Sequence, residues 1–172
     1  DTTFMDTLAE RVVIADGAMG TMLQGVDLTL DDFAGLEGCN EILNETRPDV
    51  VRHIHRAYFE AGADAVETNT FGANLPNLAD YGIADRIFDL SLKATQLARE
   101  VADDMSTAQK PRYVLGSVGP GTKLPTLGHA TFASLRDAYV ETGRGMLDGG
   151  ADAIVIETCQ DLLQVKAAVL GV

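Results

Sequence analysis

The sequence predicts an α/β fold of four parallel β-strands, each followed by an α-helix, and three observations predict it. Short apolar runs alternate along the chain with longer segments in which apolar residues recur at helical spacing. The pattern Gly-Ala-Asp-Ala precedes the second run and recurs before the fourth. Polar residues gather directly after the first, second and fourth runs. Such alternation is typical of parallel strands joined by right-handed crossovers.

The composition is that of an ordinary globular domain, and it limits the partners. The chain has 172 residues, enough for one domain with a buried core, of which 46% are hydrophobic. A formal net charge of -13 argues against nucleic acid and anionic membrane surfaces as partners. Two cysteines are too few for a disulfide framework, and no apolar run is long enough to span a membrane. We therefore expect a cytoplasmic protein.

The first apolar run, at residues 12–15, is expected to be a strand buried on both faces, and it leads into a candidate site. It ends at Asp16, which is followed by Gly17 and Gly20 in a stretch of small residues. A carboxylate beside bare backbone amides could hold the ammonium and carboxylate groups of a zwitterionic ligand. The alternative is that Asp16 caps the next turn and the glycines only turn the chain, as in many loops that follow strands.

The rest of the chain continues the alternation. Residues 22–47 form a long connection, of the kind that is functional or holds a small helix. Thr46 and Asp49 predict a capping box for a helix that Gly62 ends. The later elements are expected to be a strand at 65–70, a helix from Ile83 to Met105, a strand at 113–118, a helix from Phe132 to Gly149, a strand at 153–157 and a helix that Asp161 opens.

Four βα units fit either an open parallel sheet or one half of a (βα)₈ barrel. No Gly-x-Gly-x-x-Gly or Walker pattern follows any strand, so nucleotide binding has little support. A complete (βα)₈ barrel typically needs about 250 residues, so the chain would be half of one. In both folds the carboxyl ends of the strands form the edge where sites are built, which favours Asp16 and Glu157 as functional residues.

Six stretches carry a resemblance to a known family: Asp-Gly-Ala-Met-Gly-Thr at 16–21, Gly-Cys-Asn-Glu at 38–41, Ala-Tyr-Phe-Glu-Ala-Gly-Ala-Asp at 57–64, Glu-Thr-Asn-Thr-Phe at 67–71, Gly-Ser-Val-Gly-Pro at 116–120 and Gly-Ala-Asp-Ala-Ile-Val-Ile-Glu-Thr at 150–158. They resemble the homocysteine S-methyltransferase family. The match runs along essentially the whole chain and is fullest for the N-terminal homocysteine-binding domain of its cobalamin-dependent methionine synthases. The resemblance implies that residues 1–172 are the N-terminal half, (βα)₄, of a (βα)₈ TIM barrel.

The resemblance also implies a homocysteine site at the carboxyl ends of the strands. Asp16 and Glu157 would hold the amino group of the substrate, and the amides after Asp16 would hold its carboxylate. Two residues on the rim after the second strand would line the same pocket. The residues implied for homocysteine binding are Asp16, Gly17, Ala18, Met19, Asn69, Thr70 and Glu157.

Two cofactors, zinc and cobalamin, are implied for the full-length enzyme. Zinc would deprotonate the homocysteine thiol, and the thiolate would take a methyl group from methylcobalamin to give methionine. The family's zinc cysteines would lie beyond Val172, and Cys39 and Cys159 lack a chelating spacing. His53 and His55 point in different directions on a helix and are expected to be surface or packing residues. We therefore expect no metal site in this chain, no bound cofactor and no activity of the chain alone.

The same resemblance implies that the rest of the barrel and the folate, cobalamin and activation domains are absent from residues 1–172 and are partners of this chain. The first and fourth strands would be open edges, which the remaining half of the barrel or a second copy could pair with. Two alternatives stay open. The chain could be a fragment of a cobalamin-independent homocysteine S-methyltransferase, although residues 38–41 favour the cobalamin-dependent type. It could also be a catalytically silent half-barrel that assembles with itself or with a partner.

Overall fold

Three parallel strands form one sheet in a computed structural model that describes residues 3–172. β1 (Ala65–Glu67) pairs with β2 (Tyr113–Val118), and β2 pairs with β3 (Ala153–Ile156), in the order β1-β2-β3. The sheet alternates with helices along the chain, which confirms the predicted α/β class with parallel strands.

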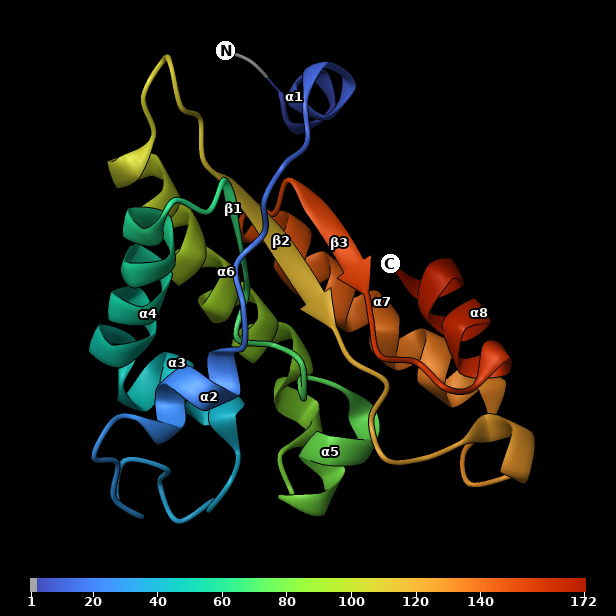
Figure 1. Cartoon of the computed structure of the whole chain (residues 1–172). Helices are drawn as coiled ribbons and strands as arrows, with labels where there is room; N and C mark the ends of the chain where they lie inside the picture. The colour runs from blue at the N-terminus through green and yellow to red at the C-terminus, as the bar shows by residue number, and fades with distance from the viewer. Residues whose placement is uncertain (1–2) are drawn as a thin grey trace.

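Figure 1 shows α4, α6 and α7 packed along one face of the sheet. None of the helices within residues 3–172 is long and apolar enough to cross a membrane. The α-helices are α1 (Phe4–Glu10), α2 (Met19–Gln24), α3 (Leu43–Thr46), α4 (Pro48–Ala61), α5 (Leu75–Asp80), α6 (Ile87–Met105), α7 (Phe132–Asp148) and α8 (Leu162–Gly171), and the short 3₁₀ helices are η1 (Asn40–Ile42), η2 (Ala84–Arg86) and η3 (Pro125–Leu127).

The segment at 12–15 differs from the buried strand that its apolar side chains predict. It runs beside β1 but makes a single parallel bridge, between Ala15 and Ala65. Val12 and Ile14 are 81% and 60% exposed. The expectation of burial on both faces is therefore wrong, because in the described part of the chain this segment is the edge of the sheet.

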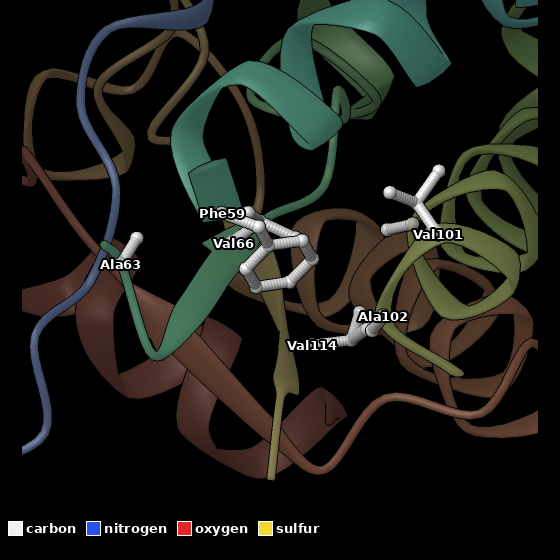
Figure 2. Packing of buried hydrophobic residues seen from close by; sticks show 7 residues of the cluster. Phe59, Ala63, Val66, Val101, Ala102 and Val114 are labelled. Carbon is white, nitrogen blue, oxygen red and sulfur yellow. The ribbon is translucent and has the colours of Figure 1, made fainter. Parts of the chain in front are cut away.

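The helix-facing side of the sheet holds a continuous apolar core. Phe59 of α4, Val66 of β1 and Val114 of β2 pack together between these elements and α6, as Figure 2 shows. Burial of such side chains stabilises the fold by about 1.5–3 kcal/mol each. The full cluster is Phe59, Ala63, Val66, Ala98, Val101, Ala102 and Val114.

The opposite face of the sheet leads to the polar residues. Side chains alternate between the two faces of a strand, so Ala65 and Glu67 share one face of β1. Ala65 belongs there to an apolar cluster that includes Leu115 of β2 and Val155 of β3. The next residues of this face towards the carboxyl ends are Glu67, Ser117 and Glu157.

The helix boundaries test the predicted caps. Gly62 ends α4 with φ of 117°, a left-handed conformation that suits glycine, as predicted. The predicted capping box is wrong. The Arg47 guanidinium donates to the Asp49 carboxylate at 2.9 Å, and the Thr46 hydroxyl donates to the Ile42 carbonyl at 3.2 Å. No side chain caps the start of α4.

Other observed boundaries of strands and helices differ from the predicted ones by a few residues. The second predicted strand, which is β1 in the structure, ends at Glu67 rather than at residue 70, because the chain turns there into the loop that holds Thr68. The fourth predicted strand ends at Ile156, although the Glu157 amide still donates to the Val118 carbonyl. The long helix begins at Ile87, after η2, rather than at residue 83. Asp161 caps α8 by accepting hydrogen bonds from backbone amides, as expected.

Candidate functional site

A cavity of about 620 Å³ opens at the carboxyl ends of the strands. Figure 1 shows α2 and α5 beyond the end of the sheet to which the strand arrows point. The loops that follow the segment at 12–15 and β1 form most of the wall, together with the connection that leads into η1. The residues that line the cavity are Asp16, Gly17, Ala18, Met19, Gly20, Gly38, Asn40, Glu41, Glu67, Thr68, Asn69, Phe71, Gly72, Asn77, Asp80, Tyr81, Ser117, Thr122 and Glu157.

Three carboxylates from different elements meet in this cavity. Asp16 follows the edge segment, Glu67 ends β1 and Glu157 follows β3. An Asp16 carboxylate oxygen accepts the backbone N–H of Glu67 at 3.0 Å. The Ser117 hydroxyl donates to a Glu157 carboxylate oxygen at 2.5 Å. Both sequence-predicted carboxylates, Asp16 and Glu157, are therefore held in the cavity, and Glu67 joins them.

Burial and mutual repulsion raise the pKa values of Asp16 and Glu67. Loss of solvent raises the pKa of Asp16 to about 7, and the negative charges of Glu67 and Glu157 add to the effect. The pKa of Glu67 is also raised, first by burial and then by the charge of Glu157. The cavity thus gathers acidic groups that a positively charged ligand group would stabilise in their ionised form.

Bare backbone amides lie beside the carboxylates. Ala18 is the N-cap residue of α2, and no side chain caps this helix start. Gly17 passes close to the Tyr58 ring, since a Cβ at position 17 would lie 3.2 Å from the Tyr58 hydroxyl. That hydroxyl donates to the Ala18 carbonyl at 3.2 Å and holds the loop in place. The amides from Gly17 to Met19 can therefore be approached by an anionic ligand group.

Asn69 and Thr70 differ in their position relative to the cavity. Asn69 lines the cavity, but its amide group donates to the Asn40 carbonyl at 2.8 Å and to the Asn44 side chain at 3.2 Å. Thr70 is buried behind the cavity, and its hydroxyl bonds to Thr68 at 2.7 Å and to the Ser117 carbonyl at 2.7 Å. Both side chains support the rim by joining strand ends to loops.

Glu41 is a site residue to which the sequence reasoning assigned no role. It is 7% exposed, lines the cavity, and accepts the Gly72 amide at 2.7 Å. A Cβ at position 72 would lie 2.6 Å from the same carboxylate, so a larger residue there would require the Glu41 side chain to shift. Residues 38–41 were among the stretches that carry the family resemblance, and this was the available signal.

The described residues do not form a metal centre. No three His, Cys, Asp or Glu side chains within residues 3–172 converge as metal ligands. Cys39 is buried, and burial beside Glu41 raises the pKa of its thiol to about 11, which disfavours the thiolate. Cys159 is half-buried, and its thiol donates to the Glu157 carbonyl at 3.2 Å. That the family's zinc ligands lie beyond Val172 stays a prediction.

Two curated relatives match nearly the whole chain. The methionine synthase of Mycobacterium tuberculosis (strain ATCC 25618 / H37Rv) is 72% identical over 171 residues, and that of Mycobacterium leprae (strain TN) is 70% identical over 171 residues. Each alignment covers 99% of this chain but only 14% of the relative. The chain thus spans about one seventh of the length of these proteins.

Solved structures of the homocysteine methyltransferase MmuM from Escherichia coli share the fold. The metallated form superposes with a TM-score of 0.76 and covers 95% of this chain and 60% of that chain. The oxidized form gives a TM-score of 0.77 with 95% and 59% coverage. Both are 24% identical to this chain, so the likeness concerns the fold alone.

A family model described as homocysteine S-methyltransferase matches residues 13–172, which include the whole cavity wall. This match covers almost the entire chain and agrees with the resemblance carried by the six sequence stretches. The chain belongs to the homocysteine S-methyltransferase family.

Proposed function

We propose that this chain is the homocysteine-binding part of a methionine synthase and holds the amino-acid end of the substrate. The observation that carries the proposal is the group of carboxylates beside bare amides in the strand-end cavity. A zwitterionic amino acid needs one anionic and one hydrogen-bond-donating subsite side by side, and both line this cavity. Membership of the family and 70% or higher identity to methionine synthases support homocysteine as the amino acid.

Each residue has a specific task in the proposed site. The Asp16 and Glu157 carboxylates accept hydrogen bonds from the ammonium group, with Ser117 fixing the orientation of Glu157. The amides of Gly17, Ala18 and Met19 donate to the carboxylate of the substrate. Held at this end, homocysteine presents its thiol to the open part of the cavity, where a methyl group can reach it.

Activation of the thiol is not assigned to the described residues. The zinc that the family resemblance implies would supply a thiolate at neutral pH, but residues 3–172 offer no convergent ligand set for it. Cobalamin is proposed as the methyl carrier of the longer protein, in agreement with the likeness to methionine synthases. The chain itself binds and orients the amino acid, and we propose that it is inactive without the remaining parts.

Residues 1–172 are proposed to form half of a (βα)₈ barrel. The edge segment at 12–15 is exposed and makes one bridge, and all four residues of β3 are only half-buried. Both lateral edges of the sheet, at the segment 12–15 and at β3, are thus available for pairing with further strands. The 14% coverage of the methionine synthases supports additional domains as partners of this chain.

Isothermal titration calorimetry of the chain with L-homocysteine tests the proposal. Asp16→Asn and Glu157→Gln are each expected to weaken binding at pH 7.5 at least about tenfold, because a hydrogen bond to a charged group contributes roughly 1.5–3 kcal/mol. The analogue 4-mercaptobutyrate lacks the amino group and should bind weakly to the unmodified chain and be insensitive to both substitutions.

Glu100→Gln is the matched control, since Glu100 is an exposed carboxylate on α6 that pairs with Arg52 far from the cavity. Its affinity for L-homocysteine should equal that of the unmodified chain. Equal binding of L-homocysteine and 4-mercaptobutyrate, or unchanged affinity in Asp16→Asn and Glu157→Gln, would refute the proposed site.

A further inference from the structure

The cavity carries more negative charge than a zwitterionic amino acid neutralises. Asp16, Glu67 and Glu157 line one cavity and act on one another electrostatically, whereas an ammonium group brings a single positive charge. None of the cavity-lining side chains within residues 3–172 is lysine, arginine or histidine. Three ionised carboxylates in a half-buried cavity repel one another, so a protonated carboxyl is the remaining source of charge relief.

The hydrogen bonds distinguish the three carboxyl groups. Glu157 accepts the Ser117 hydroxyl at 2.5 Å, so its carboxylate has a hydrogen-bond donor in the cavity. Asp16 accepts the Glu67 amide at 3.0 Å, which brings the Asp16 carboxyl next to the end of β1. The Glu67 carboxylate, in contrast, accepts no hydrogen bond from any group in residues 3–172. Glu67 is thus the half-buried carboxylate with the least support for its charge.

We propose that Glu67 and Asp16 share one proton in the free protein and that an incoming α-ammonium group displaces it. The identity of the ligand rests on the proposed function, whereas the shared proton does not. Glu67 is then a positioning residue of the amino-group subsite, because it keeps Asp16 partly neutral until a cation arrives and makes the subsite selective for positive charge.

The surroundings of the pair contain only neutral or acidic groups. Tyr58 of α4 lies close enough for the charge of Asp16 to act on it. The other titratable side chains that line the cavity are Glu41 of η1, Asp80 and Tyr81 at the end of α5, and Glu157 after β3. Burial raises the pKa of Asp16 to about 7 and raises that of Glu67 as well. These directions agree with a proton held near neutral pH.

A shared proton makes ligand binding depend on pH in a defined direction. Below pH 7 the free pair is protonated, and an ammonium ligand must expel the proton in order to bind. The affinity should therefore fall by up to tenfold, or about 1.4 kcal/mol, for each pH unit below 7. Above pH 7 the pair is ionised, and the affinity should level off.

The first measurement is a ¹³C NMR titration of the Asp16 carboxyl in the ligand-free chain, with Asp16→Asn to assign the signal. The unmodified chain should titrate near pH 7, and Glu67→Gln should lower the midpoint by about one pH unit, because a neighbouring negative charge is removed. Asp80→Asn, which removes an exposed carboxylate at the end of α5 that also lines the cavity, should leave the midpoint unchanged. A midpoint below pH 5 in the unmodified chain, or the same midpoint in Glu67→Gln, would overturn the proposal.

The second measurement counts protons released on binding. L-Methionine is the probe, since it has the amino-acid end of homocysteine but no thiol that could titrate. Calorimetry at pH 6 in phosphate and in Bis-Tris, two buffers with different ionisation enthalpies, should give release of about one proton per ligand for the unmodified chain and clearly less for Glu67→Gln. If L-methionine and L-homocysteine both fail to bind, the proposed function fails, and the NMR titration still decides whether Glu67 and Asp16 share the proton. Binding with no proton release at pH 6 would refute the displacement step.

Discussion

His55 shows how a single residue couples the stability of this fold to pH. Its imidazole is fully buried in α4, and neither ring nitrogen has a hydrogen-bond partner within the described residues. Burial lowers its pKa to about 4, because the charged form is not solvated. In the unfolded chain the side chain titrates near the ordinary histidine pKa of 6.5. The unfolded state thus binds more protons between these values, and stability falls as the pH drops below 6.5.

Replacing His55 with leucine should remove this acid sensitivity. Protonation of His55 in the unfolded state should lower the unfolding free energy of the unmodified chain by about 2 kcal/mol between pH 7.5 and pH 5. The decrease in unfolding free energy over the same pH range should be about 2 kcal/mol smaller in His55→Leu. Urea unfolding followed by circular dichroism at the two pH values measures the difference. His53→Gln, an exposed histidine on the same helix, should behave like the unmodified chain. An equal acid loss in His55→Leu would contradict the assignment.

The sequence indicated some site residues better than others, and the reason is local. Asp16 stands directly after an apolar run and before glycines, so its place at a strand end could be predicted. Glu41 could not be placed, because its contact with Gly72 joins two loops far apart in the chain. Thr70 was expected on the rim, but its hydroxyl turns back to the Ser117 carbonyl. Such choices depend on tertiary contacts that no short pattern encodes.

At the scale of elements, the repeated Gly-Ala-Asp-Ala pattern has a structural basis. The Asp64 carboxylate accepts the Ile14 amide at 3.0 Å, and the Asp64 amide donates to the Ile14 carbonyl at 2.7 Å. Asp152 makes the same two bonds to Val114, at 2.7 and 2.8 Å. Each aspartate thus ties the start of its strand to the neighbouring strand. Each also pairs with one arginine: Arg11 with Asp64 and Arg99 with Asp152.

The same scale explains which elements were predictable. The segment that became α4 has apolar residues at helical spacing and ends at a glycine, and both signals act within one turn of the chain. The exposure of 12–15 was missed, because whether an apolar strand is buried depends on neighbours elsewhere in the fold. The capping box failed for a similar reason, since Arg47 competes for the Asp49 carboxylate.

The contact between α6 and α7 gives a prediction for a single glycine. A Cβ at Gly145 would lie 2.6 Å from the Phe88 carbonyl oxygen and 2.9 Å from the Leu92 amide nitrogen, both in the backbone of α6. Gly145→Ala should lower the unfolding free energy by about 1–3 kcal/mol, because the helices must move apart. This outweighs the gain in helix propensity of up to about 1 kcal/mol.

Thermal and urea unfolding measure the effect of Gly145→Ala. The control is Gly20→Ala in α2, where a Cβ would meet nothing within 4 Å and the propensity gain should appear alone. If both substitutions stabilised the chain equally, the close approach of α6 and α7 at Gly145 would be refuted.

At the scale of the whole molecule, apolar side chains are exposed at both lateral edges of the sheet. Val12 and Ile14 lie on the edge segment, and Leu162, Val169 and Leu170 lie on α8 next to β3. α7 lies between α6 and α8, away from the two lateral edges of the sheet. This distribution is expected if further βα units continue the sheet from β3 and return to the segment at 12–15, as the half-barrel proposal requires.

A lysine at position 14 tests that proposal. In the 172-residue chain, Ile14→Lys should change the unfolding free energy by less than about 0.5 kcal/mol, because the side chain is largely exposed. In a chain extended at its C-terminus by the residues that follow the matched region in the Mycobacterium tuberculosis relative, closure of a barrel would cover this edge. The same substitution should then cost about 2 kcal/mol or more, since a charged side chain would be buried. Leu147→Lys, at the exposed end of α7, should cost little in both chains. If Ile14→Lys were equally mild in both, the added residues would not cover the edge, and the half-barrel proposal would be wrong.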